Sequence, residues 1–147
     1  RAHNEIGIIY LSQKKYDLAI PALEKAIKNN PSFDQAYDNL GVAYDMKGDL
    51  NKAILQYKRA LELNPGNPKT YNNMGSAYIK LEEYDKAIEA YQNALSISPT
   101  FKSVFNNLGA AYYRKGMFDK ARECWEKALE IDPNFTQPLS NLKLLKK

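Results

Sequence analysis

The feature that most constrains this chain is a set of residues that returns every 34 positions. One copy of the set consists of Tyr37, Leu40, Gly41, Tyr44, Ala53, Tyr57, Ala60 and Pro65. Adding 34 once gives a copy that ends at Pro99, adding it twice gives one that ends at Pro133, and subtracting it gives one that ends at Pro31. Four units at one spacing predict a solenoid, in which each unit packs only on its neighbours.

Each unit has the pattern of two helices joined by a turn. Apolar residues recur at spacings of three and four, as between Tyr37 and Tyr44, which places one apolar stripe on each helix. A turn around a residue such as Gly48 separates the stripes, and a proline such as Pro65 ends the second one. Gly41 falls where the two helices of a unit should touch. The pattern therefore predicts an all-α chain of antiparallel helix pairs.

The repeated set resembles the tetratricopeptide repeat, whose pattern has an aromatic residue, Leu, Gly, Tyr, Ala, a second aromatic, Ala and Pro in this order. The resemblance implies a right-handed superhelical solenoid and a single domain, residues 1–147. The repeats are expected at about 1–33, 34–67, 68–101 and 102–135, followed by a partial repeat or capping helix at 136–147. The first repeat departs from the pattern at His3 and Leu23, and Pro21 falls inside its second helix.

Composition argues against two classes of partner. The chain is 44% hydrophobic but has no apolar run long enough to cross a bilayer, so direct membrane insertion by this segment is not expected. The net charge is +4, of which Lys143, Lys146 and Lys147 supply three charges as a tail. Nucleic-acid binding is not expected either, because it needs a concentrated basic face.

The cysteine count and the first residues bear on context. The only cysteine, Cys124, cannot form an internal disulfide, which fits either a reducing compartment or simply a disulfide-free fold. Of the possible locations, the cytoplasm is favoured. The sequence does not begin with Met and opens partway into a first helix. We therefore expect truncated termini and a longer parent protein.

The residue inventory does not point to an enzyme. The only histidine, His3, falls at a core-type position, and Cys124 has no other histidine to activate it. Every glycine is assigned to a helix contact or a turn, so no phosphate-binding loop is present. Clusters of His or Cys that could hold a metal are missing from the sequence as well. No cofactor is expected.

In the tetratricopeptide repeat family the first helices of successive repeats line a concave groove that binds an extended peptide or a partner's helix. The resemblance places the groove at repeat positions 2, 5, 6, 9, 12 and 13, counted here from Asp34, Pro68 and Lys102. Position 6 carries asparagine in four successive units, at Asn39, Asn73, Asn107 and Asn141. A carboxamide has both a donor and an acceptor, so this ladder could pair with the peptide groups of an extended chain.

Charges at the other groove positions predict an electrically lopsided surface. Acidic residues fall toward the N-terminal half and basic ones toward the C-terminal half, at Glu5, Asp38 and Asp45 and at Lys69, Lys80 and Arg114 respectively. Such a field would orient a charged peptide. Tyr113 also falls on this side and is the one ring outside the recurring positions, whereas rings such as Phe118 recur and are explained by packing.

These positions define the expected peptide-binding residues: Asn39, Asn72, Asn73, Asn106, Asn107, Lys80, Tyr113 and Arg114. One binding mode of the family is not expected, the clamp on a C-terminal carboxylate, which uses Lys at position 5 and Asn at position 9. Here these two positions read Asn4 and Ile8, Asp38 and Val42, Asn72 and Ser76, and Asn106 and Ala110. The cationic half of the clamp is missing.

The sequence thus predicts a non-catalytic protein–protein interaction scaffold that binds a polypeptide segment of another protein in its concave groove. Two alternatives stay open. The chain could be a self-associating structural scaffold, because the unmatched ends of a solenoid expose apolar surface. It could also be the substrate-recruiting arm of a larger enzyme.

Overall fold

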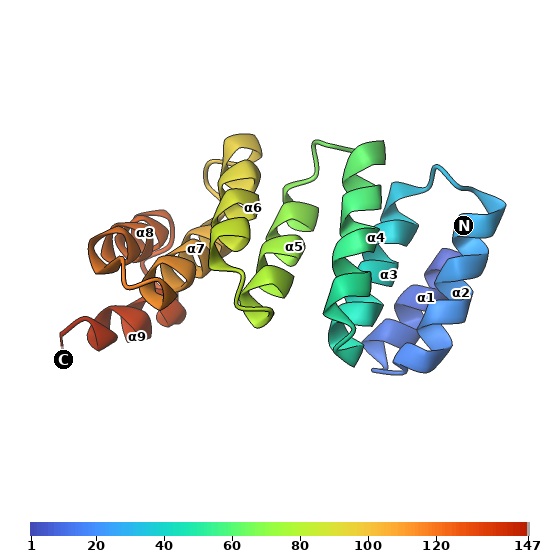
Figure 1. The fold of residues 1–147 in the computed structure, drawn as a ribbon, viewed down its shortest axis with the longest axis horizontal. Helices are drawn as coiled ribbons and strands as arrows, with labels where there is room; N and C mark the ends of the chain where they lie inside the picture. The colour runs from blue at the N-terminus through green and yellow to red at the C-terminus, as the bar shows by residue number, and fades with distance from the viewer. Residues whose placement is uncertain (147) are drawn as a thin grey trace.

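The computed structural model describes residues 1–146, and all of their regular structure is helical (Figure 1). The expected basic tail extends one residue further, to Lys147, which lies outside the described residues. The helices are α1 (Ala2–Ser12), α2 (Tyr16–Asn29), α3 (Asp34–Lys47), α4 (Leu50–Leu63), α5 (Pro68–Lys80), α6 (Tyr84–Ile97), α7 (Lys102–Arg114), α8 (Phe118–Ile131) and α9 (Thr136–Leu144). None of these helices is both long and apolar enough to cross a membrane.

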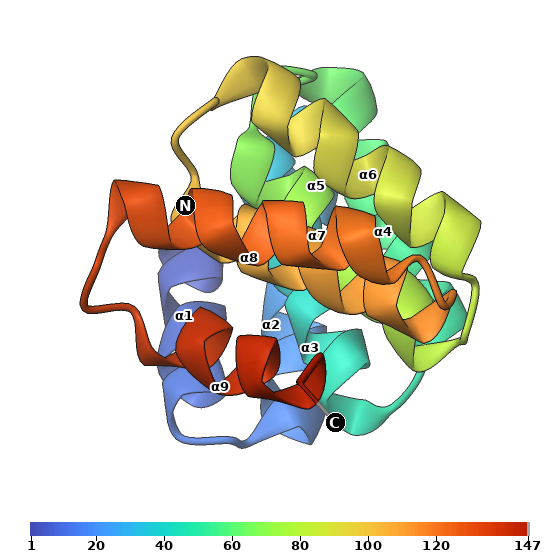
Figure 2. The same ribbon diagram turned by 90° about the vertical axis from the view of Figure 1, so that its left-hand side faces the viewer.

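The helices form antiparallel pairs that stack in chain order. Each odd-numbered helix packs on the even-numbered helix that follows it, and that helix packs on the next odd-numbered one. Within residues 1–146 the odd-numbered helices also contact one another in succession, whereas the even-numbered helices do not. The stack therefore curves with α1, α3, α5, α7 and α9 on its inner side, and the pairs rotate about the long axis (Figure 2). This is the expected superhelical solenoid.

Glycine allows the two helices of each pair to approach closely. A Cβ atom on Gly41 would lie 2.5 Å from Cε1 of Tyr57, and one on Gly75 would lie 2.6 Å from Cε1 of Tyr91. These distances are too short for carbon atoms, so a side chain at the glycine position would push the pair apart. In α9 the equivalent position is occupied by Lys143. The last helix therefore departs from the repeat pattern at this position.

The turns within the pairs share one backbone conformation. The residue just after α3 or close after α7 is a glycine with positive φ, 92° at Gly48 and 80° at Gly116. The equivalent residues of the first and third pairs adopt the same left-handed conformation without being glycine, with φ of 59° at Lys14 and 60° at Glu82. Left-handed backbone costs energy for residues that carry a Cβ atom.

The prolines fall where the sequence pattern predicts, with one informative exception. Pro65 lies just beyond the last residue of α4, Leu63, and the other repeats place a proline in the same way. Pro21 lies inside α2 and is exposed, and the helix nevertheless continues to Asn29. Pro21 is the sixth of the 14 residues of α2, so its ring removes one intrahelical backbone donor from an exposed position of the helix.

Candidate functional site

Side-chain hydrogen bonds join each inner helix to the next along the concave side. The amide nitrogen of Asn107 donates to the amide oxygen of Asn72 at 3.0 Å. Asn39 donates in the same way to Asn4 at 3.1 Å, and Asn141 donates to Asn106 at 3.0 Å. Each bond runs from position 6 of one repeat to position 5 of the preceding one. The asparagine ladder is therefore part of the joints between repeats.

The joint between the second and third repeats contains a carboxylate in place of the accepting amide. Asp38 accepts a hydrogen bond from the Thr70 hydroxyl at 3.0 Å and also accepts one from the side chain of Asn73. Burial raises the pKa of Asp38, and the two hydrogen bonds, which favour the ionised form, offset this only in part. Position 5 of this repeat is thus a half-buried acid that is engaged by the next repeat.

After these hydrogen bonds between repeats are formed, the asparagine side chains differ in how many donors and acceptors remain for a ligand. A primary amide has two N–H groups and an oxygen, so Asn39 and Asn107 each keep one N–H and the oxygen after donating once. Asn106 is only 6% exposed, donates to Gln137 at 3.1 Å and accepts from Asn141. The sequence-based prediction included Asn106 as a ligand contact. The structure corrects this, because both ends of its amide are engaged within the protein.

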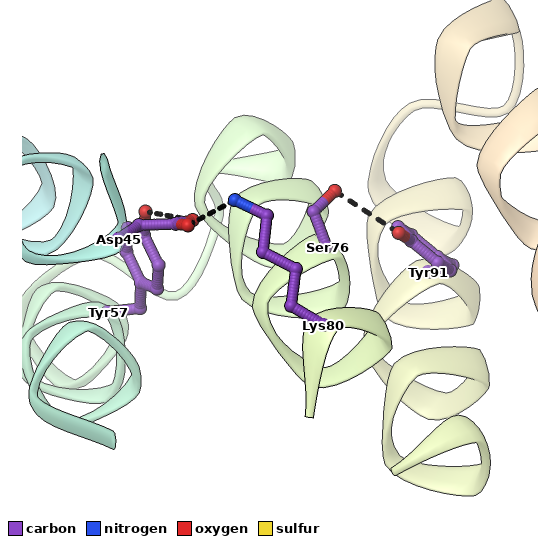
Figure 3. A network of polar contacts seen from close by, with 5 residues as sticks. All are labelled: Asp45, Tyr57, Ser76, Lys80 and Tyr91. Atoms are coloured by element: carbon purple, nitrogen blue, oxygen red, sulfur yellow. Dashed lines mark hydrogen bonds and ion pairs between the residues drawn. The ribbon is translucent and has the colours of Figure 1, made fainter. Parts of the chain in front are cut away.

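The predicted separation of charge along the groove is also corrected. Lys80 Nζ lies 2.5 Å from Oδ1 of Asp45, one repeat earlier, so these opposite charges meet (Figure 3). Asp45 also accepts from the Tyr57 hydroxyl at 3.5 Å, and its side chain is 11% exposed. Since Asp38 and Asp45 are both engaged within the protein, much of the expected acidic half is not available to a ligand.

The buried rings of the outer helices reach the inner helices with their polar ends. The Tyr91 hydroxyl lies 3.2 Å from the Ser76 hydroxyl (Figure 3). Trp125 donates from Nε1 to the backbone oxygen of Asn106 at 3.1 Å. Burial raises the pKa of Tyr91 to about 12, and burial followed by the nearby Asp45 carboxylate raises the pKa of Tyr57. These rings form structural hydrogen bonds, and burial keeps the two tyrosines in their neutral form.

Tyr113 and Arg114 occupy the C-terminal end of the inner face. Tyr113 is half-buried, with its ring centroid 5.3 Å from that of Phe118 and 5.9 Å from that of Trp125. Phe118 is 50% exposed, so the prediction that packing covers it holds only on the side of Tyr113. Arg114 is exposed, and no ion pair is formed by it within the described part of the chain. Lys80 at position 13 pairs with Asp45 at position 12 of the preceding repeat. Arg114 is also at position 13, but position 12 of its preceding repeat is Ile79, which carries no charge.

The contacts that sequence reasoning missed follow a spacing of 35 rather than 34. Asn72 and Asn107, like Asp45 and Lys80, are separated by one repeat plus one residue. Polar residues at adjacent positions 5 and 6, and a charged pair at positions 12 and 13, were visible in the sequence. A comparison of each repeat with the next at this shifted spacing would have found them.

Two further features of the described residues concern the single cysteine and the residue types that can bind metal ions. The half-buried Cys124 has a thiol whose pKa burial raises to about 12, which keeps the thiol protonated. Residues 1–146 contain no group of three or more His, Cys, Asp or Glu placed to hold a metal ion.

Family models for the tetratricopeptide repeat match residues 4–68, 56–89, 75–116 and 103–135. A solved structure of MamA has 31% identity and a TM-score of 0.84, covering 90% of this chain and 78% of that chain. The chain belongs to the tetratricopeptide repeat family. A search of curated proteins found no match.

Two other tetratricopeptide repeat structures show how widely the fold is shared. PilF of Pseudomonas aeruginosa has 26% identity and a TM-score of 0.86, covering 93% of this chain and 63% of that chain. The first such domain of Spaghetti, solved with an HSP90 peptide, has 23% identity and a TM-score of 0.75, covering 77% of this chain and 90% of that chain. The similarity to Spaghetti concerns the fold alone.

Proposed function

We propose that this tetratricopeptide repeat chain is a non-catalytic interaction module that binds an extended polypeptide along its concave side. The observation that carries the proposal is the set of half-buried amides at Asn39, Asn73 and Asn107, one per repeat. Asn39 and Asn107 each have one hydrogen bond to the preceding repeat and keep a donor and an acceptor for a ligand. An amide that is already held in place loses less conformational entropy on binding than a free side chain.

The spacing of the repeats suits an extended chain. Packed helices lie about 8–10 Å apart, and an extended peptide advances about 3.3 Å per residue. Each amide would therefore meet roughly every third residue of the ligand. Because a backbone hydrogen bond contributes only about 1 kcal/mol net, we expect modest affinity and tolerance of sequence.

Side chains near the ends of the groove would supply selectivity. Arg114 offers an exposed cation, and Lys80 is half exposed although it pairs with Asp45. Tyr113, with Asn72 beside the ladder, completes the proposed site. We expect a preference for a peptide whose acidic residues lie near α7. The reason is that Arg114 has Ile79 at the position equivalent to Asp45, so its cation has no acidic partner there.

The comparison with Spaghetti supports this use of the fold within a limit. That protein was solved with an HSP90 peptide, so a solenoid of this fold has room for a peptide. The present chain lacks the Lys at position 5 that a carboxylate clamp requires, with Asn72 and Asn106 at two of these places. The proposed ligand is therefore held by its backbone rather than by its C-terminal carboxylate.

A displayed library of ten-residue peptides tests the proposal. The wild type is compared with the triple variant Asn39→Ala, Asn73→Ala, Asn107→Ala, which should lose most of the selected peptides. Asn4→Ala is the matched control, because it removes the hydrogen-bond partner of Asn39 but leaves Asn39 itself. Equal binding by the triple variant, once far-UV circular dichroism shows that it is folded, would reject the proposal.

Self-association is a second candidate, and one observation favours it. Ile6 and Ile9 of α1 are 42% and 54% exposed, whereas the equivalent Leu40 and Ala43 of α3 are 4% and 0% exposed because they pack on α2. Within residues 1–146, α1 therefore presents an apolar face. Light scattering over a range of concentrations, with Ile9→Lys as the variant, tests it; a monomer at all concentrations rules it out.

A further inference from the structure

The outer side of the solenoid contains a recess that the proposed groove does not use. A cavity of about 380 Å³ lies over α7, with Phe105, Leu108 and Tyr112 from α7 and Lys120, Glu123, Cys124 and Lys127 from α8. On a helix, Phe105, Leu108 and Tyr112 lie on the face opposite Asn106 and Asn107, because of the 3.6-residue period. This recess is therefore separate from the concave groove.

The same recess recurs one repeat earlier. A cavity of about 280 Å³ is lined by Met74 and Tyr78 from α5, by Lys86, Glu89, Ala90 and Asn93 from α6, and by Lys58 from α4. Six of these lining residues are the equivalents, 34 positions earlier, of residues that line the larger cavity. The third and fourth repeats therefore form the same kind of recess, with a floor from the inner helix and walls from the outer helices.

Two side chains near Phe105 differ from their equivalents in the second repeat. In the second repeat the equivalents of Cys124 and Lys127 are Gln56 and Arg59, and the Arg59 guanidinium lies 5.9 Å from the centroid of the Tyr37 ring. The ring of Phe105, which is the equivalent of Tyr37, has the smaller Cys124 beside it. Lys127 instead lies 3.6 Å from Glu130. Phe105 is partly exposed as a result, whereas Tyr37 is 8% exposed; the deeper floor residues Leu108 and Tyr112 are 5% and 8% exposed.

The rim of each recess is rich in cations. Lys120 Nζ lies 5.5 Å from the centroid of the Tyr112 ring, and Lys127, which also lies 3.6 Å from Glu130, is the second cation. Glu123 is the one acid among the lining residues. The earlier recess has the same balance, with Lys58 and Lys86 against Glu89. An apolar floor with two cations and one acid on its rim is complementary to an apolar side chain that has carboxylates on either side.

We propose that the recess over α7 binds an acidic polypeptide segment of a partner, with one large apolar side chain inserted against Phe105, Leu108 and Tyr112. The anchor would remove apolar surface from water, and the flanking carboxylates would lie near Lys120 and Lys127. The chain would then have two distinct interaction surfaces, an inner one that binds peptide backbone and an outer one that binds an acidic segment.

Calorimetric titration with three blocked pentapeptides tests the inference. The first has Phe between two pairs of Asp, the second has Ala in place of Phe, and the third has Lys in place of Asp. We expect the first to bind at least tenfold more tightly than either of the others. The same affinity for the Ala peptide would overturn the proposal, because no anchor would then be inserted. Absence of binding at millimolar concentration of the first peptide would overturn it too.

Variants that use residues from another repeat locate the binding. The double variant Cys124→Gln, Lys127→Arg gives the last repeat the two residues that cover the floor in the second repeat, so it should fold and bind the Phe peptide at least tenfold more weakly. Lys120→Glu should lower the affinity for the acidic Phe peptide and raise the affinity for the peptide that has Lys in place of Asp. The triple variant at Asn39, Asn73 and Asn107 should leave this titration unchanged. Full affinity in the covered variant, or loss in the triple variant, would place the binding elsewhere.

Discussion

The side-chain amide of Asn107 donates to the amide oxygen of Asn72, 35 residues earlier, at 3.0 Å. The same relationship joins Asn39 to Asn4. Asparagine at position 6 therefore has a structural role in this chain whether or not a ligand is present. The stability of the joint can be measured apart from any binding.

A double-mutant cycle on Asn72→Ala and Asn107→Ala should show coupling. Each single variant leaves one half-buried amide without its partner, so each should lower the free energy of unfolding by about 1 kcal/mol. The double variant should cost about 0.5–1 kcal/mol less than the sum. Urea denaturation measures all three values, with the exposed Asn51→Ala as control. Strict additivity would show that the hydrogen bond contributes nothing to stability.

Gly75→Ala should destabilise the chain by about 1–3 kcal/mol, because the added methyl group would collide with the Tyr91 ring. Gly66→Ala is the matched control, since a Cβ atom there would meet only Asn64 Oδ1, at 3.7 Å. Chemical denaturation of both variants gives the comparison. If the two variants lose the same stability, close contact between the paired helices is not the reason for glycine at this position.

Glu82→Gly should stabilise the chain by about 0.5–1 kcal/mol. Glu82 has a φ of 60°, and Gly48 and Gly116 occupy the equivalent turns. The gain from relieving left-handed strain exceeds the added entropy of the unfolded glycine at such a site. The thermal midpoint measures the effect, and Gly48→Ala should lower it. A lower midpoint for Glu82→Gly would mean that the Glu82 side chain stabilises the turn by more than its backbone strain.

Asp38→Asn should make the chain more stable near neutral pH, by a few tenths to about 1 kcal/mol. Burial raises the pKa of Asp38 above 3.8, so the folded state holds its proton more strongly than the unfolded state does. Its contribution is therefore most favourable below pH 3.8 and is lost as pH rises through the folded pKa. Asparagine stands at this position in the neighbouring repeats, as Asn4 and Asn72.

The measurement for Asp38→Asn is the free energy of unfolding across the acidic range. Wild type should lose stability relative to the variant as pH rises from below 3.8 toward neutrality. Thr70→Val is a useful companion, because it removes one hydrogen bond that favours the ionised carboxylate. A difference between wild type and Asp38→Asn that stays constant with pH would show that the carboxylate titrates as it does in the unfolded chain.

Much of the fold could be predicted from the 34-residue period, because local signals place its parts. Apolar spacing marks the helix faces, and prolines such as Pro65 mark where pairs end. Gly41 marks the helix contact. Each of these features depends on residues that are close in sequence or that recur at the same position of every repeat, so the sequence alone indicates them. Even the left-handed turn at Gly48 was marked by a glycine, although Lys14 adopts the same conformation without that signal.

The candidate site could be predicted only in outline. The inner face was correctly placed, but the state of its side chains depends on how far each repeat is rotated relative to the next. That rotation brings Lys80 onto Asp45 and Asn141 onto Asn106, so charges and amides assigned to a ligand are engaged by the protein. Tyr113 packs on Phe118 within its own helix pair, across the turn between α7 and α8. The residue pattern of a single repeat does not specify the rotation between repeats.

Because the amides of Asn39 and Asn107 hold adjacent repeats together, they also set the pitch of the superhelix. A peptide that took over their remaining N–H and oxygen would pull on the same side chains that fix this pitch. The pitch of the superhelix and the affinity for the peptide would then vary together. A change at one asparagine would alter the orientation of every repeat beyond it.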